Sequence, residues 1–142
     1  MTYNDLLQHY FERSNALQNY WTLYVVVIGG LLAFSSIRKQ GDWLTTLLVS
    51  ILFSFFAYKN LGAIGEVTEQ RFAIQDVVWK TLPPPMERTE VDKERTRLLG
   101  TLTPPAYEGV RNFHVTSDVL TILALWSMER RRQRHASESH PA

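Results

Sequence analysis

Two long apolar runs near the start of the chain constrain its fold more than any other feature. The first, residues 20–37, has no ionisable side chain except tyrosine, and the second, residues 43–58, follows after a short turn. At about 1.5 Å of rise per residue, each run as a helix comes close to the roughly 30 Å of a bilayer's hydrocarbon core. Two such runs so close together predict a membrane hairpin rather than two buried helices of a soluble domain.

The overall composition excludes several classes of function. A net charge of +1 gives no electrostatic basis for a nucleic-acid partner. The chain has no cysteine, which rules out disulfides, thiolate metal sites and a cysteine nucleophile. Its mean hydropathy of −0.15 would suit a soluble protein, but that average combines the apolar runs with a polar stretch at 66–111.

We expect an all-α fold, a small integral membrane helical bundle with three transmembrane helices and a helical extension after the second. The first run is expected to remain as an anchor, because the residues before it lack the short basic leader of a signal peptide. The expected segments are, in chain order, an amphipathic N-terminal helix (1–19), transmembrane helices at 20–37 and 43–61, a helical extension (62–80), a polar, proline-bounded linker (81–110), a third transmembrane helix (111–128) and a basic, disordered tail (129–142).

The third apolar stretch, residues 113–128, is shorter and less uniform than the other two. On a helical wheel His114, Ser117, Asp118 and Thr121 fall on one side, and the rest is apolar. Such a helix either crosses the membrane with its polar side facing the other spans, or lies in the interface as an amphipathic helix. The wide apolar arc favours a third crossing.

Basic residues near the ends of these stretches predict the orientation. Arg38 and Lys39 lie in the hairpin turn, and a basic cluster follows the third stretch: Arg130, Arg131, Arg132 and Arg134. The positive-inside rule assigns both places to the cytoplasm, and three crossings put them on the same side. The N-terminus and residues 61–109 are then expected outside, and the basic cluster suits anionic lipid headgroups. Without a third crossing, the N-terminus and everything after the hairpin share one compartment.

The first span contains signals for both its interface and its packing. Its first aromatic residues are expected at the headgroup level, as amphipathic rings prefer: Tyr20, Trp21 and Tyr24. Further along, Gly29 and Ala33 form a small-xxx-small pair with Gly30 beside them. Small residues let helix backbones approach, and we expect them to pack against the second span rather than to drive self-association.

The second span carries a stripe of hydroxyl groups. Thr46, Ser50 and Ser54 are spaced by four and therefore stack on one helical face. The stripe could line a pore or form a packing seam. The seam is favoured, because serine and threonine also hydrogen-bond to carbonyls of their own helix.

His114 and Asp118 are the chief candidates for a site that carries chemistry. They are four residues apart on one helical face, within hydrogen-bonding reach, and ionisable groups at membrane depth are functional candidates by default. The functional interpretation is a proton relay or an ion site, with Asp118 as carrier and His114 tuning it. The structural interpretation, which is favoured, is a pair that fixes the start of the helix.

No motif in the sequence predicts catalysis, a metal site or a cofactor. The histidines lack ligand spacing, and no phosphate loop, nucleophile elbow or dinucleotide fingerprint is present. We therefore expect no enzyme, but a non-catalytic membrane protein that acts as an accessory subunit or anchor. Its expected partners are the lipid bilayer and either a protein partner or a second copy of itself. The alternative is a homo-oligomeric pore or an ion or proton pathway.

Overall fold

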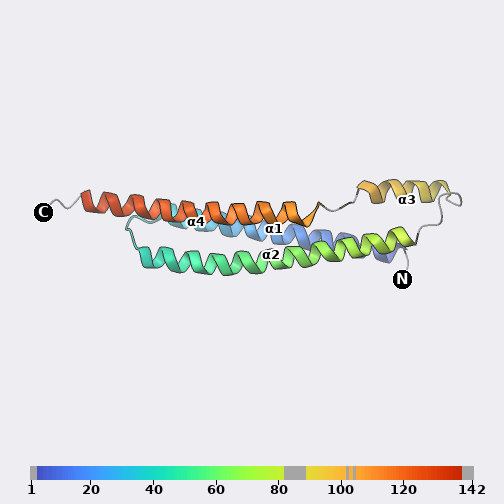
Figure 1. Ribbon diagram of the computed structural model, residues 1–142, viewed down its shortest axis with the longest axis horizontal. Coiled ribbons are helices and arrows are strands. Elements are labelled where there is room, and N and C mark those ends of the chain that lie inside the picture. Colours follow the sequence, from blue (N-terminus) through green and yellow to red (C-terminus); the bar gives the residue numbers. More distant parts are fainter. Residues whose placement is uncertain (1–2, 82–88, 102, 104, 139–142) are drawn as a thin grey trace.

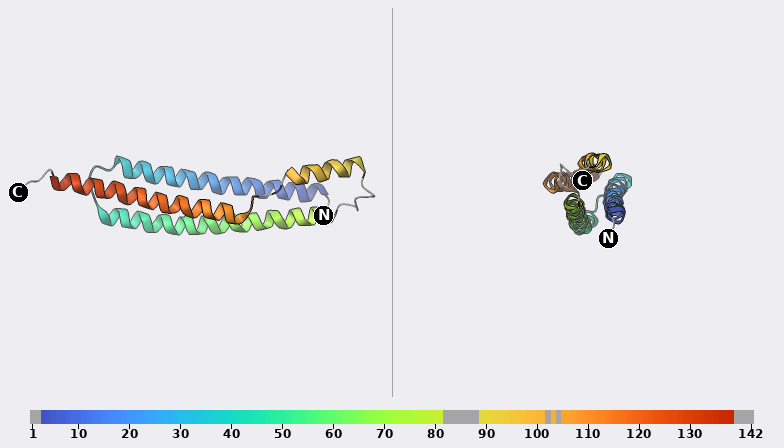
Figure 2. Two further views of the ribbon diagram at one scale, coloured as in Figure 1. Left: turned by 45° about the horizontal axis from the view of Figure 1, so that its top comes forward. Right: turned by 90° about the vertical axis from the view of Figure 1, so that its right-hand side faces the viewer.

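A computed structural model describes residues 3–81, 89–101, 103 and 105–138, and within these ranges the chain is all α-helical, with no strand. The four helices are α1 (Tyr3–Ile37), α2 (Trp43–Lys80), α3 (Glu90–Thr101) and α4 (Tyr107–Glu138). Helices α1, α2 and α4 lie side by side along the long axis of the molecule, and α3 lies at the end where α1 begins (Figure 1). The end-on view in Figure 2 shows α1, α2 and α4 packed around one axis, with α3 beside them.

Hydrogen bonds between the helices define their relative register. Near its start α4 contacts Tyr24 of α1 and Asn60 of α2, and near its end it contacts Ser35 of α1 and Thr46 of α2. Helix α4 therefore runs parallel to α1 and antiparallel to α2. The hairpin turn and the end of α4 lie together at one end of the bundle, which we call the arginine end (Figure 1).

The buried positions of α2 alternate in steps of four and three. The series is Thr46, Ser50, Phe53, Ala57, Asn60, Ile64 and Val67. The buried residues of α4 are His114, Thr121, Leu125 and Glu129, with spacings of seven, four and four. A period of 3.5 residues is that of left-handed coiled-coil packing, so α2 presents a heptad seam to the bundle. Polar residues occupy several of these seam positions.

Two local features connect α1 to α2 and hold α2 against α4. Asp42 caps α2 by accepting hydrogen bonds from the backbone N–H of Leu44 and Thr45. The hydroxyl and backbone N–H of Thr45 hold the pKa of Asp42 below its usual range. Gly41 leaves room for α4, because a Cβ at this position would lie 3.0 Å from Cγ of Gln133.

Helix α2 continues without a break from the second apolar run through the polar segment at 62–80. The polar linker contains α3, whose first turn is closed by a capping box. Thr89 Oγ1 donates to Asp92 Oδ2 at 2.7 Å, and the N–H of Asp92 donates back to Thr89 Oγ1 at 3.3 Å. Leu99 then packs with Leu6 and Val78 in a small core at this end, which we call the α3 end.

The expectation of a disordered tail from residue 129 is corrected by the structure. Helix α4 extends to Glu138, because Glu129 and Arg132 bond to α1 and α2 and hold the segment against the bundle. Residues 139–142 lie outside the described residues.

Helices α1 and α2 are long and apolar enough to cross a membrane, whereas α4 is not among the candidate spans. Large hydrophobic side chains stand exposed on all three helices, in a zone that we call the apolar belt. It comprises Leu23, Val25, Val26, Phe34, Ile37, Trp43, Leu44, Leu48, Ile51, Leu52, Phe55, Tyr58, Phe113, Val115, Val119, Leu120 and Leu123. The three stretches that carry the belt lie beside one another in the register given above.

Candidate functional site: two buried polar layers

The first polar layer is centred on His114, whose side chain is completely buried between the three long helices. Its Nδ1 lies 2.9 Å from Asp118 Oδ2, and its Nε2 lies 3.2 Å from the amide nitrogen of Asn60. Tyr24 donates its hydroxyl to Asp118 Oδ1 at 2.8 Å. We call these four residues the histidine layer.

The geometry of the histidine layer selects one arrangement of protons. The amide nitrogen of Asn60 is a donor, so the Nε2 that faces it is the acceptor. The single proton of a neutral imidazole then lies on Nδ1 and is donated to Asp118. A second proton on His114 would lie on Nε2 and face the amide NH2 of Asn60. The amide would then have to rotate so that its oxygen accepts this proton. The layer can therefore hold a proton between His114 and Asp118 at a place where burial makes an unpaired charge costly.

Aromatic rings enclose the imidazole of His114. The ring of Tyr24 lies 4.0 Å from it, centroid to centroid, and that of Trp21 lies at 5.8 Å. Tyr24 was expected at the headgroup level but is buried, because its hydroxyl finds partners on α4 and its ring joins a core with Phe53 and Ala57. Tyr24 therefore faces protein in the bundle interior rather than solvent or lipid.

The second polar layer, the glutamate layer, lies at the arginine end and is centred on Glu129, which is 1% exposed. Thr46 Oγ1 donates to Glu129 Oε2 at 3.0 Å, and Gln133 Nε2 donates to Oε1 at 3.0 Å. Arg132 pairs with Oε2 at 3.2 Å and also donates to the carbonyl and hydroxyl of Ser35, at 2.8 and 2.9 Å. The buried carboxylate thus has donors from α2 and α4, and its arginine is tied to α1.

A largely apolar section separates the two layers along α4. Leu125, 2% exposed, lies one turn before Glu129 on the inward face. Thr121 is also buried there, but its hydroxyl donates to the carbonyl of Ser117 in its own helix. The two layers do not join into a continuous hydrogen-bonded chain within the described residues.

The hydroxyl stripe of α2 divides between two roles. Thr46 belongs to the glutamate layer. Ser50 is buried and donates to the carbonyl of Thr46 at 2.8 Å, and Ser54 is exposed and donates to the carbonyl of Ser50 at 2.8 Å. This geometry supports the packing seam over the pore lining, since the hydroxyl protons of both serines are already used.

The small residues of α1 do not pack against the second span, contrary to expectation. Gly29, Gly30 and Ala33 are exposed, and a Cβ at either glycine would have no neighbour within 4 Å. The physical reason is that the flanking large side chains of α1, Ile28 and Leu31 among them, pack against the core and bury more apolar area.

The basic cluster also divides in two. Arg132 is half-buried and directed into the glutamate layer, while Arg130, Arg131 and Arg134 are exposed. On α4 itself, the polar side expected from the helical wheel is the inward one, since His114 and Thr121 are buried.

Sequence reasoning missed Asn60 and Glu129 as members of these layers. A signal for both was present. Asn60 follows Phe53 and Ala57 in the heptad series of α2, whereas Glu129 follows Thr121 and Leu125 on α4 in steps of four. A heptad reading of α2, and extension of the inward face of α4 by one turn past Leu125, would have placed both in the interior.

No group of three or more metal-ligating side chains occurs among the residues that the structure describes. Comparisons of the chain with protein-family models, with curated proteins and with solved structures find no match.

Proposed function

We propose that this chain is a non-catalytic integral membrane protein, an accessory subunit or anchor whose α3 end contacts a protein partner. In this proposal α1, α2 and α4 cross the bilayer, and the arginine end lies in the cytoplasm. The single observation that carries the proposal is the apolar belt. Large hydrophobic side chains remain exposed around three packed helices, and water would solvate such a surface poorly.

The low burial of the two candidate spans supports lipid as the solvent. Only 11% of the most apolar window of α1 and 28% of that of α2 are buried. A core helix of a soluble protein would instead be mostly buried. The polar side chains His114, Glu129 and Thr46 are turned inward, beside apolar ones, which is the arrangement that a lipid-facing bundle requires of its polar groups.

The distribution of charge supports the proposed orientation. Arg38 and the basic cluster lie at the same end of the bundle, as the contact of Arg132 with Ser35 requires. The belt ends on α1 and α2 at Ile37 and Trp43, beside the hairpin turn, and the α3 end has a small, separate core with exposed hydrophobic side chains of its own, such as Phe72 and Trp79. The positive-inside rule then favours a cytoplasmic arginine end and an α3 end on the opposite side.

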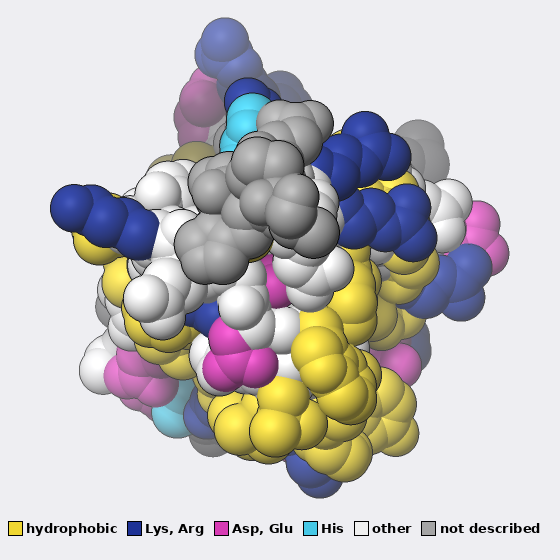
Figure 3. All heavy atoms as spheres, turned by 90° about the vertical axis from the view of Figure 1, so that its left-hand side faces the viewer, with side chains coloured by type: hydrophobic (Ala, Val, Ile, Leu, Met, Phe, Trp, Pro, Cys, Tyr) yellow, Lys and Arg dark blue, Asp and Glu magenta, His cyan; other side chains and the backbone are white. Residues whose placement is uncertain are grey.

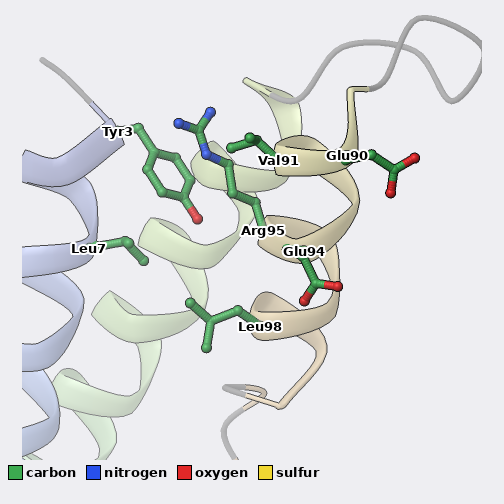
Figure 4. Close-up of a pocket in the computed structure, with 7 residues that line it drawn as sticks. All are labelled: Tyr3, Leu7, Glu90, Val91, Glu94, Arg95 and Leu98. Carbon is green, nitrogen blue, oxygen red and sulfur yellow. The ribbon is translucent and has the colours of Figure 1, made fainter.

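The α3 end offers a surface suited to a protein partner. A groove of about 580 Å³ lies between α1 and α3. Figure 4 shows Leu7 and Leu98 reaching toward it from opposite walls, Tyr3 and Arg95 stacked across its upper part, and Glu90 and Glu94 pointing outward. Such a groove suits an apolar segment flanked by basic residues, because the outward carboxylates complement positive charge.

Co-purification from native membranes tests this function. A stoichiometric partner is expected to accompany the full chain and to be lost with Val91→Glu, which introduces a charge into the groove. Val77→Glu is the matched control, because Val77 is an exposed valine of α2 that does not line the groove. Loss of the partner with both variants, or with neither, contradicts the proposal.

A second function, a proton or ion pathway, is favoured by one observation: the histidine layer is buried at the depth of the apolar belt. Leu125 interrupts the route to the glutamate layer, so conduction requires this section to open or hydrate. Reconstitution in liposomes distinguishes the two functions. A proton or ion flux that disappears with Asp118→Asn supports the pathway. Liposomes that show no flux with the unchanged protein contradict it.

A further inference from the structure

An open pocket at the arginine end is lined by guanidinium groups. It has a volume of about 340 Å³ and lies where the end of α1 meets the end of α4. Its walls are formed by Ser35, Ser36, Arg38, Met128, Arg131, Arg132 and His135. Figure 3, which faces this end, shows several Lys and Arg side chains there, with hydrophobic side chains beside some of them.

Two of the three arginines are held in place by the bundle itself. Arg132 is fixed by the carbonyl and hydroxyl of Ser35, at 2.8 and 2.9 Å. Arg38 donates to Thr46 Oγ1 at 3.3 Å and to the carbonyl of Asp42 at 3.2 Å. An anion that binds here meets charges that are already positioned, so little side-chain entropy is lost on binding.

The third arginine, Arg131, is exposed and has no hydrogen-bond or ion-pair partner among the residues that the structure describes. None of the residues that line the pocket is acidic. Among the described residues two carboxylates lie nearby. That of Glu129 is buried and shared among Thr46, Gln133 and Arg132. That of Asp42 has its pKa lowered by hydrogen bonds from Thr45 and in part by the charge of Arg38. These two carboxylates offset the charges of Arg132 and Arg38, and the pocket keeps the positive charge of Arg131.

We propose that this pocket binds a phosphate group, and that an anionic phospholipid headgroup is its source. Several guanidinium groups around one open cavity match the several oxygens and the charge of a phosphate, which planar arginine side chains recognise by paired hydrogen bonds. The end of the apolar belt, with Phe34 and Ile37 of α1, lies beside the pocket and provides a surface for the acyl chains. This choice of source rests on the proposed membrane insertion, whereas the pocket itself does not.

The test measures binding to the purified full-length protein by isothermal titration calorimetry. The probes are inorganic phosphate, a short-chain phosphatidylglycerol and the matching short-chain phosphatidylcholine, each below its micelle concentration. Saturable one-to-one binding of the phosphatidylglycerol, tighter than that of the other two probes, supports the lipid headgroup. Equal binding of inorganic phosphate supports the phosphate site and overturns the lipid source. No saturable binding of either anion overturns the proposal.

Arg131→Gln and Arg130→Gln form the matched pair of variants. Both remove one exposed arginine from α4, but only Arg131 lines the pocket. Arg131→Gln is expected to weaken binding at least about tenfold, through loss of a charge-assisted hydrogen bond, and Arg130→Gln by no more than about fivefold. Equal losses would show a diffuse electrostatic effect and overturn the site. Should the chain prove soluble without detergent, the membrane proposal fails, and the titration with inorganic phosphate still tests the pocket.

Discussion

His114 and Asp118 lie one turn apart on α4, with Nδ1 and Oδ2 separated by 2.9 Å, and both are joined to α1 through Tyr24. The hydroxyl of Tyr24 reaches Asp118 Oδ1 at 2.8 Å and the carbonyl oxygen of His114 at 3.2 Å. A pair that sequence alone places on one helix is thus also a contact between helices. A buried network of this kind specifies register, because a shift of α4 by one turn would leave its members without partners.

We predict energetic coupling between Tyr24 and Asp118. Tyr24→Phe removes the donor and Asp118→Ala removes the acceptor, so the double variant should lose less stability than the sum of the single variants. The expected coupling free energy is about 0.6–1.7 kcal/mol, the range of hydrogen bonds between helices in membranes. Unfolding in mixed micelles with increasing SDS, followed by circular dichroism, measures it.

Tyr20→Phe is the control for this cycle, because Tyr20 has no hydrogen-bond partner among the described residues. It should change the free energy of unfolding by less than about 0.5 kcal/mol. Strictly additive effects of Tyr24→Phe and Asp118→Ala would mean that the hydrogen bond does not form.

The glutamate layer yields a prediction about charge. Glu129→Leu leaves Arg132 and Thr46 without their buried acceptor and should reduce the free energy of unfolding by about 3–5 kcal/mol. Glu129→Gln keeps an acceptor oxygen and should cost distinctly less. Glu108→Leu, at an exposed position of α4, should be nearly neutral. The same SDS titration compares all three variants. If Glu129→Leu lowers the free energy of unfolding no more than Glu108→Leu does, the glutamate layer does not stabilise the bundle.

The all-helical fold of the chain could be predicted from the sequence because each long helix has local sequence signals. Apolar runs, the capping residue Asp42 and the helical stripe through Ile74 and Val78 are all properties of neighbouring residues. The pairing of His114 with Asp118 was predictable for the same reason, since both lie on one turn.

The partners of that pair could not be predicted, because Tyr24 and Asn60 lie far away in the sequence. Which face of α1 turns inward depends on competition among its side chains. The large residues prevail over Gly29 and Gly30, which leaves the glycines exposed. Glu129 lies next to a run of arginines, where the composition indicates a solvated tail, and only its place one turn after Leu125 on the inward face of α4 indicates an interior residue.

Two glycines of α2 should respond differently to alanine. At Gly62 a Cβ has no neighbour within 4 Å, whereas at Gly65 it would lie 3.0 Å from the hydroxyl oxygen of Tyr107. Gly62→Ala should therefore stabilise the protein by up to about 1 kcal/mol through helix propensity. Gly65→Ala should gain less or lose stability, because the ring of Tyr107 must move. Thermal unfolding measures the stability change of each variant. In a Tyr107→Ala background, the stability change of Gly65→Ala should come closer to that of Gly62→Ala.

The capping box of α3 should control local opening at the α3 end. Thr89→Ala removes the hydroxyl that bonds with Asp92 and should cost about 0.5–2 kcal/mol of local stability. Hydrogen exchange in residues 90–101 should accelerate, while exchange in the apolar parts of α1 and α2 stays unchanged. Thr96→Ala is the control, since it replaces a mid-helix threonine with a better helix former and should slow exchange. Equal exchange in both variants would show that the box does not hold α3.

The register of α4 makes a prediction about sidedness that tests the whole arrangement in a membrane. Single cysteines at Lys39 and Arg134 should react with an impermeant maleimide from the same side of sealed vesicles, because both positions are exposed at the arginine end. Cysteines at Glu69 and Glu94, exposed toward the α3 end, should react only from the opposite side. The chain has no native cysteine, so each label reports one position. If Arg134 reacts together with Glu69 and apart from Lys39, then α4 does not cross with α1 and α2. The buried contacts of His114 and Glu129 would then have to break in the bilayer, at a free-energy cost that no lipid contact would offset.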